Sequence, residues 1–193
     1  EHLMTEGGER GAMRAIIDGW FYALEEEVLA REGDCAEEQL LQTTEALMTE
    51  RLRPIERQAP AFGACLRAYR HAVAAGDEAL ASGLIAWMSG QPNVAAATKR
   101  AAGIKGDIDH FGALGFLQGL LLILRDSGFS GLVLVLDEVE TLQRVRGDIR
   151  EKSFNALRQF MDEIDAGRFP GLYLMITGTP AFVLKDVVMR GYA

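Results

Sequence analysis

A run of five consecutive apolar residues, Leu132 to Leu136, constrains the fold of this chain more than any other feature. The run has no polar face, which is typical of a strand buried on both sides in a parallel sheet covered by helices. Two carboxylates, Asp137 and Glu138, follow it directly. In open α/β sheets, ligands bind at the edge formed by the carboxyl ends of the strands. The sequence therefore predicts two acids at the ligand-binding edge of a covered sheet.

A second all-apolar run, Leu172 to Ile176, ends at a Thr-Gly-Thr-Pro sequence that contains Thr177 and Thr179. A helix is predicted between the two runs, from the helical spacing of Phe154, Leu157, Met161 and Ile164. Asp148 and Glu151, three residues apart, resemble a capping box at its start. A strand, a helix and a strand over this length predict a βαβ unit with parallel strands.

The first half of the chain is predicted to be all helical. A helix over about residues 12–31 has Ile16, Trp20, Leu24 and Val28 on one face. Gly33 fits its end, Asp34 can cap the next helix, and Asn93 can cap a later short one. We predict an α/β protein, mainly helical, with a helical region over residues 1–105 and a small parallel sheet within 106–193.

A turn at Gly106-Asp107 is expected to introduce a long helix over about residues 108–126. Gly112, Gly115 and Gly119 share one face of it, although glycine costs about 1 kcal/mol relative to alanine inside a helix. This pattern indicates close approach to another element, and we interpret it as tight helix–sheet packing rather than as a ligand site.

The net charge of −8 is concentrated in residues 1–60, which contain 14 acids and 6 bases. This acidic segment is a poor surface for nucleic acid, because phosphate binding needs clustered Lys and Arg. Cys35 and Cys65 are expected to be free thiols in a reducing cytoplasm. No signal peptide is visible, and the most apolar segment, residues 116–124, is too short to span a membrane.

The acidic end of the first apolar run is typical of a Walker B element in a nucleotide-hydrolysing P-loop protein. Asp137 would hold Mg²⁺, which prefers hard oxygen ligands, and Glu138 would orient the attacking water. Thr177 could sense the γ-phosphate from the neighbouring strand, and Thr179 is a less favoured substitute. The alternative is purely structural, with Asp137 capping a turn and Glu138 a solvated residue at a helix start.

The phosphate-binding string G-x-x-x-x-G-K-[ST] that accompanies a Walker B element does not occur in residues 1–193. The glycine–lysine cluster at residues 103–106 has the wrong spacing, and we predict a loop there. The histidines and cysteines do not have zinc-ligand spacing. Five basic residues form a further cluster, which we interpret as a solvated helix face, a nucleic-acid contact or an arginine donated to a neighbouring subunit. They are Arg144, Arg146, Arg150, Lys152 and Arg158.

Three strings together resemble a bacterial family of P-loop ATP-binding proteins that is linked to bacteriophage-exclusion (BREX) defence and was formerly a domain of unknown function. They are LVLVLDEVETLQRVRGD, FNALRQFMDEIDAGRFPGLYLMITGTPAF and IKGDIDHFGALGFLQGLLLIL. The resemblance extends from about Phe62 to Phe182. In layout the family is similar to AAA-type ATPases and to the signal-transduction ATPases with numerous domains (STAND).

The resemblance implies ATP and Mg²⁺ as cofactors, with Asp137 as the Mg²⁺-associated acid, Glu138 as the catalytic base and Thr177 as the sensor. It also implies a Walker A segment upstream of residue 1, a helical insertion over residues 11–105, and assembly as a homo-oligomer or with defence-system proteins. We therefore expect a cytoplasmic ATPase segment. A non-catalytic helical interaction module and a nucleic-acid-handling module remain as alternatives.

Overall fold

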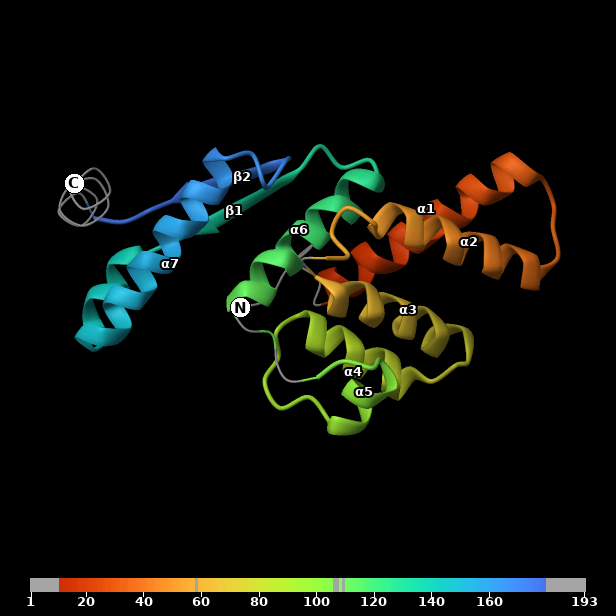
Figure 1. Cartoon of the computed structure of the whole chain (residues 1–193), viewed down its shortest axis with the longest axis horizontal. Coiled ribbons are helices and arrows are strands. Elements are labelled where there is room, and N and C mark those ends of the chain that lie inside the picture. The colour runs from red at the N-terminus through yellow and green to blue at the C-terminus, as the bar shows by residue number, and fades with distance from the viewer. Residues whose placement is uncertain (1–10, 58, 106–107, 109, 180–193) are drawn as a thin grey trace. The chain divides into compact units, whose positions relative to one another are not determined.

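The chain forms two compact units, a helical unit (Glu1–Phe129) and a sheet unit (Ser130–Ala193). A computed structural model describes residues 11–57, 59–105, 108 and 110–179 (Figure 1). The turn predicted at Gly106-Asp107 lies outside these residues. The long helix that follows it belongs to the helical unit by its contacts. The predicted division of the family fold into residues 1–105 and 106–193 stays a prediction.

The regular elements of the helical unit are all α-helices within its described residues, as predicted. Its helices are α1 (Ala12–Glu32), α2 (Glu37–Leu52), α3 (Pro60–Ala74), α4 (Glu78–Met88), α5 (Ala96–Ala101) and α6 (His110–Asp126). Gly33 ends α1 with φ 77°, and its N–H donates to the carbonyl of Leu29, which confirms the predicted stop. Figure 1 shows α3, α4 and α5 gathered together within this unit.

Two predicted helix caps are wrong. Helix α2 begins after Ala36 rather than after Asp34, and α5 begins after Ala95 rather than after Asn93. Both observed cap residues are alanines, whose side chains cannot accept a hydrogen bond, so neither helix start depends on a side-chain cap. Asp77 does cap α4, because its carboxylate accepts from the N–H of Leu80 at 3.0 Å.

A half-buried polar cluster joins three helices of the helical unit. The carboxylate of Asp126, at the end of α6, accepts from the indole N–H of Trp20 at 2.7 Å and from Arg51 at 2.6 Å. Arg51 in α2 also donates to Glu27 of α1 at 2.8 Å. Charge-assisted hydrogen bonds of this kind are shorter and stronger than neutral ones. The cluster therefore fixes α1, α2 and α6 at one end of the apolar core.

Gly119, one of the three glycines on this face of α6, packs against a helix and not against a sheet. A Cβ atom built on Gly119 would lie 2.6 Å from two ring carbons of Phe62, which belongs to α3. The Phe62 ring also makes an edge-on contact with Phe116, with 5.0 Å between the ring centroids. Gly119 thus allows the close approach that the sequence predicted, but the neighbour is an aromatic side chain of the helical unit.

Substitution of Gly119 by Ala should lower the free energy of unfolding. Overpacking of a core costs about 1–3 kcal/mol, whereas alanine gains about 1 kcal/mol over glycine in a helix, so we expect a net loss of up to about 2 kcal/mol. Gly19→Ala is the matched control, since nothing lies within 4 Å of its Cβ position, and it should stabilise. Urea unfolding followed by tryptophan fluorescence measures both, because Trp20 and Trp87 lie in this unit. Equal effects of the two substitutions would contradict the packing.

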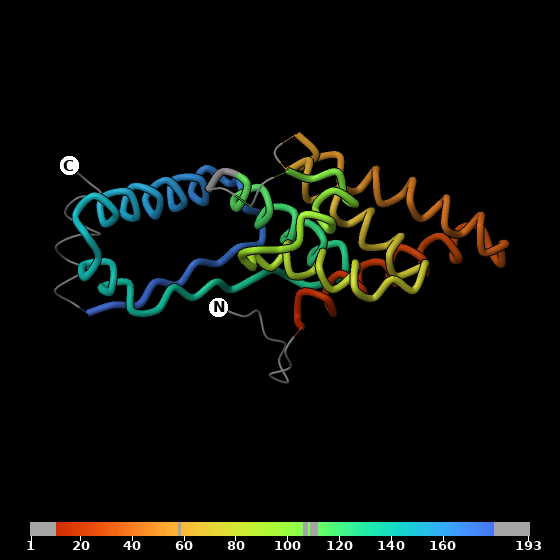
Figure 2. Tube along the Cα trace, turned by 90° about the horizontal axis from the view of Figure 1, so that it is seen from below, coloured from red at the N-terminus to blue at the C-terminus, as the bar shows by residue number. Residues whose placement is uncertain are grey.

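The sheet unit contains the predicted strand–helix–strand arrangement. Strand β1 (Leu132–Leu136) is followed by the 3-10 helix η1 (Val139–Arg144), α7 (Gly147–Asp165) and β2 (Leu172–Ile176). The two strands pair in parallel, with Leu132 opposite Leu172 and Leu136 opposite Ile176. Figure 2 shows α7 running alongside the strand pair. The chain is therefore mixed α/β, mainly helical, with a small parallel sheet.

The prediction that β1 is buried on both faces is wrong for the described residues. Burial alternates along both strands, and one face exposes Val133 (60%), Val135, Tyr173 (64%) and Met175. The other face is only half-buried, and α7 contributes no buried residue. The physical reason is that two strands and one helix cannot cover both faces of a sheet.

The capping box predicted at Asp148 is also not formed. Helix α7 begins at Gly147 after Arg146, no side chain caps it, and Asp148 lies in its first turn, 3.4 Å from Nε of Arg146. An acid in the first turn still interacts favourably with the helix dipole.

Across the described residues, no helix has both the length and the apolar character needed to cross a membrane.

Candidate functional site

The carboxyl ends of β1 and β2 meet at one edge of the sheet, as parallel pairing requires. The hydrogen-bond ladder continues past both strands at this edge. The N–H of Thr177 donates to the carbonyl of Leu136 at 2.9 Å, and the N–H of Val139 donates to the carbonyl of Thr177 at 3.3 Å. The backbone of residues 136–139 is therefore attached to the backbone of residue 177.

At the amino end of the strand pair, a close contact between two glycines helps to fix the register of the strands. The N–H of Leu132 donates to the carbonyl oxygen of Gly171 at 2.8 Å. A Cβ atom on Gly131 would lie 2.2 Å from that same oxygen, which no side chain could tolerate. Since a slip by one residue would turn every side chain to the other face, this contact helps decide which groups meet at the far edge.

Asp137 and Thr177 are in direct contact at the carboxyl edge. One carboxylate oxygen of Asp137 accepts from the hydroxyl of Thr177, and the same oxygen accepts from the backbone N–H of Glu138 at 2.9 Å. The predicted neighbourhood of these residues is thus observed. The second bond is also the local turn contact expected if Asp137 has only a structural role, so this geometry is compatible with both interpretations.

Glu138 is held in an unusual backbone conformation. Its φ of 52° and ψ of 44° are left-handed, and its side chain is exposed. This conformation costs about 1–2 kcal/mol for a residue with a side chain, and such strain concentrates at functional sites. The sequence carries no signal for it, because glycine or asparagine would be the usual choice.

The remaining candidates differ in their relation to this edge. Thr179 is exposed, and no hydrogen bond joins it to Asp137 or Glu138 in the part of the chain that is described. Glu140, which the sequence analysis missed, has a buried carboxylate oxygen without a hydrogen-bond partner among the described residues. The basic residues of the cluster after Glu138 are mostly exposed, and Arg146 pairs with Asp148.

Both cysteines are free, as predicted. Cys65 is buried in the helical unit, and burial raises the pKa of its thiol to about 12. A thiol with so high a pKa is protonated at neutral pH and is a poor nucleophile. Cys65 therefore has a packing role.

The donor groups at the sheet edge suit a magnesium ion that keeps most of its water ligands. They do not suit a metal ion enclosed by protein side chains. Within the described ranges, no group of three or more His, Cys, Asp or Glu side chains could hold a metal. Asp137 offers a single exposed carboxylate beside a hydroxyl. Mg²⁺ is commonly held in this way, with one or two carboxylates while water and substrate phosphates supply its other ligands.

Comparison with known proteins identifies the family of the chain and a ligand named for that family. Residues 1–189 match the model of the family described as BREX system ATP-binding protein BrxC/D. The chain belongs to this family. The resemblance found in its sequence is therefore confirmed, and ATP is the ligand that the family name prints. No curated protein and no solved structure matches the chain.

Glycine at position 138 should stabilise the sheet unit. Relief of about 1–2 kcal/mol of left-handed strain exceeds the roughly 0.5–1 kcal/mol entropic cost of glycine, so a gain of up to about 1 kcal/mol is expected. Slower hydrogen exchange of the Val139 and Thr177 amides would report it, because both bond across the strand ends. Glu138→Ala keeps the strain and should give no gain; an equal gain in both variants would contradict the argument.

Proposed function

We propose that the sheet unit is part of the ATP-hydrolysing P-loop core of a BREX-system ATPase. The observation that carries the proposal is the contact between the Asp137 carboxylate and the Thr177 hydroxyl at the carboxyl edge of a parallel pair. Ligands of open α/β sheets bind at this edge. Membership of an ATP-binding family supports a nucleotide as the ligand.

In this proposal each residue has a distinct task. Asp137 helps to hold Mg²⁺, which neutralises charge on the phosphate oxygens when bound. Glu138 accepts a proton from the water that attacks the γ-phosphate, and its exposed side chain can reach a ligand outside the edge. Thr177 donates its hydroxyl to Asp137 or to a phosphate oxygen, and Thr179 is the second candidate for that contact.

The phosphate-binding loop and the rest of the sheet would come from a segment of the parent protein outside residues 1–193. Two observations support this part of the proposal. The string G-x-x-x-x-G-K-[ST] is absent from the sequence. The face of the sheet with Val133, Val135, Tyr173 and Met175 is exposed within the described residues, although parallel sheets are normally covered on both faces.

The alternatives have less support. A non-catalytic interaction module would not require a strained acid beside the Asp137–Thr177 contact. A nucleic-acid-handling module would use the basic cluster, but Arg146 is paired with Asp148 and residues 1–60 carry an excess of acids. We further propose that the parent acts with protein partners of the defence system or as a homo-oligomer, in the cytoplasm.

Glu138→Gln should trap ATP in the full-length parent protein. The amide keeps the size of the side chain but cannot accept a proton, so hydrolysis should fall by about 10²–10⁴-fold, the usual contribution of general base catalysis. ATP binding should remain. Glu151→Gln, at an exposed position of α7, is the matched control and should hydrolyse ATP normally. Normal turnover of the Glu138→Gln variant, measured by phosphate release, would exclude Glu138 as the base.

Thr177 can be tested with a pair of substitutions. Thr177→Ser keeps the hydroxyl that donates to Asp137, whereas Thr177→Val keeps the shape and removes the donor. We expect the serine variant of the full-length parent to retain ATP hydrolysis and the valine variant to lose at least about tenfold, as expected for a missing hydrogen bond to a charged group of about 1.5 kcal/mol or more. The kcat for ATP measures this difference. Equal rates would remove Thr177 from the proposed mechanism.

A further inference from the structure

The chain passes from the helical unit to the sheet unit between Phe129 and Ser130. Helix α6 ends at Asp126, and β1 begins at Leu132. Residues 127–131 therefore connect the two units, and we call them the interunit segment. The part of this segment whose backbone is held by neither unit decides where the units can turn relative to each other.

The first part of the interunit segment is bonded to the end of α6. The N–H of Gly128 donates to the carbonyl of Arg125 at 3.0 Å. The N–H of Phe129 donates to the carbonyl of Leu124, also at 3.0 Å. With Gly128 at φ 87°, this pair of bonds is a Schellman motif, a common end of a helix. Residues 127–129 therefore belong structurally to α6.

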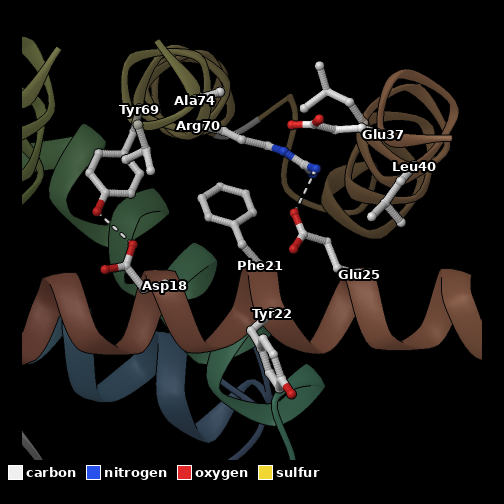
Figure 3. Close-up of a pocket in the computed structure, with 11 residues that line it drawn as sticks. Asp18, Phe21, Tyr22, Glu25, Glu37, Leu40, Tyr69, Arg70 and Ala74 are labelled. Carbon is white, nitrogen blue, oxygen red and sulfur yellow. Dashed lines mark hydrogen bonds and ion pairs between the residues drawn. The ribbon is translucent and has the colours of Figure 1, made fainter. Parts of the chain in front are cut away.

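Helix α6 is in turn fixed within the helical unit. The polar cluster around Asp126 attaches its last residue to α1 and α2. Helices α1 and α3 are joined by two further bonds (Figure 3). The hydroxyl of Tyr69 donates to Asp18 at 2.6 Å, and Nη2 of Arg70 donates to Glu25 at 3.0 Å. The helices are thus cross-linked into one body that includes the first part of the interunit segment.

The last residue of the interunit segment is held by the sheet unit. A Cβ atom on Gly131 would lie 2.2 Å from the carbonyl oxygen of Gly171, to which the N–H of Leu132 donates at 2.8 Å. Ser130 lies between the two attachments and is exposed. No hydrogen bond joins Ser130 to any residue in the described part of the chain.

We propose that Ser130 is a hinge about which the helical unit turns as a rigid body relative to the sheet unit. Rotation about its φ and ψ breaks no bond of residues 127–129 and leaves Gly131 in contact with the sheet unit. Hinges are commonly a few residues near the ends of elements that absorb the change in backbone angles. Since strand register is unaffected, the contact of Asp137 with Thr177 should persist during the motion. The helical unit can therefore reorient without disturbing the sheet edge.

Amide hydrogen exchange of the 193-residue chain, followed by NMR, tests the position of the hinge. The amides of Phe129 and Leu132 donate to carbonyls, whereas the Ser130 amide does not. After correction for intrinsic rates, the first two should exchange at least about tenfold more slowly than the Ser130 amide. Exchange of either amide as fast as that of Ser130 would overturn the assignment of the hinge to this residue.

Distances between spin labels test the motion itself. In a Cys35→Ser background, Glu38→Cys and Glu151→Cys place one label in each unit, whereas Glu38→Cys and Arg100→Cys place both in the helical unit. All three labelled positions are exposed. We expect the distance distribution of the first pair to be at least about twofold broader than that of the second. Equal widths would overturn the hinge.

A proline at position 130 should narrow the broad distribution to the width found within the helical unit. Proline fixes φ near about −65° and restricts the preceding residue, and Ser130→Pro removes no hydrogen bond of the described residues. Ala95→Pro is the matched control, since Ala95 is exposed with φ −53°, and it should leave the distribution broad. Narrowing in both variants, or in neither, would overturn the proposal. If a melting curve shows that Ser130→Pro is unfolded, the two label pairs without it decide the outcome.

Discussion

The parallel pairing of β1 with β2 is the constraint on which the candidate site depends. The pair is set at one end by the contact of Gly131 with the carbonyl of Gly171, and it is prolonged at the other end by bonds of Thr177 to Leu136 and Val139. In an antiparallel pair the residues that follow the two strands would lie at opposite edges. Parallel pairing in this register is what brings the Asp137 carboxylate to the Thr177 hydroxyl.

The two units reach stability by different means. The helical unit has a core of fully buried side chains, among them Trp20, Phe62 and Tyr69, and a polar cluster around Asp126. The strands and α7 of the sheet unit are at most half-buried. Since hydrophobic stabilisation scales with the apolar area removed from water, the sheet unit has little of its own. Its carboxyl edge relies on backbone hydrogen bonds. In the proposed function, further parts of a P-loop core would cover its exposed apolar face.

The sequence predicted the helices and strands better than it predicted their burial and their caps. Apolar runs and helical spacing were sufficient for β1, β2 and α7, because backbone geometry imposes these periods locally. Burial of Val133 and Val135 could not be predicted, because it depends on what covers the strand. Asp34, Asn93 and Asp148 were plausible caps that the helices do not use, because a cap worth about 1 kcal/mol is too weak to fix a helix start by itself. The left-handed Glu138 has no sequence signal.

By itself, the sequence determined the family, the order of helices and strands, and the presence of Asp137, Glu138 and Thr177 at strand ends. These properties follow from local pattern and from the match to a family model. Tertiary structure alone decided that Asp137 and Thr177 touch, that Gly119 faces Phe62, and that Glu25 pairs with Arg70. The physical reason is that these contacts join residues 40 or more positions apart, and their geometry is set by how whole elements pack.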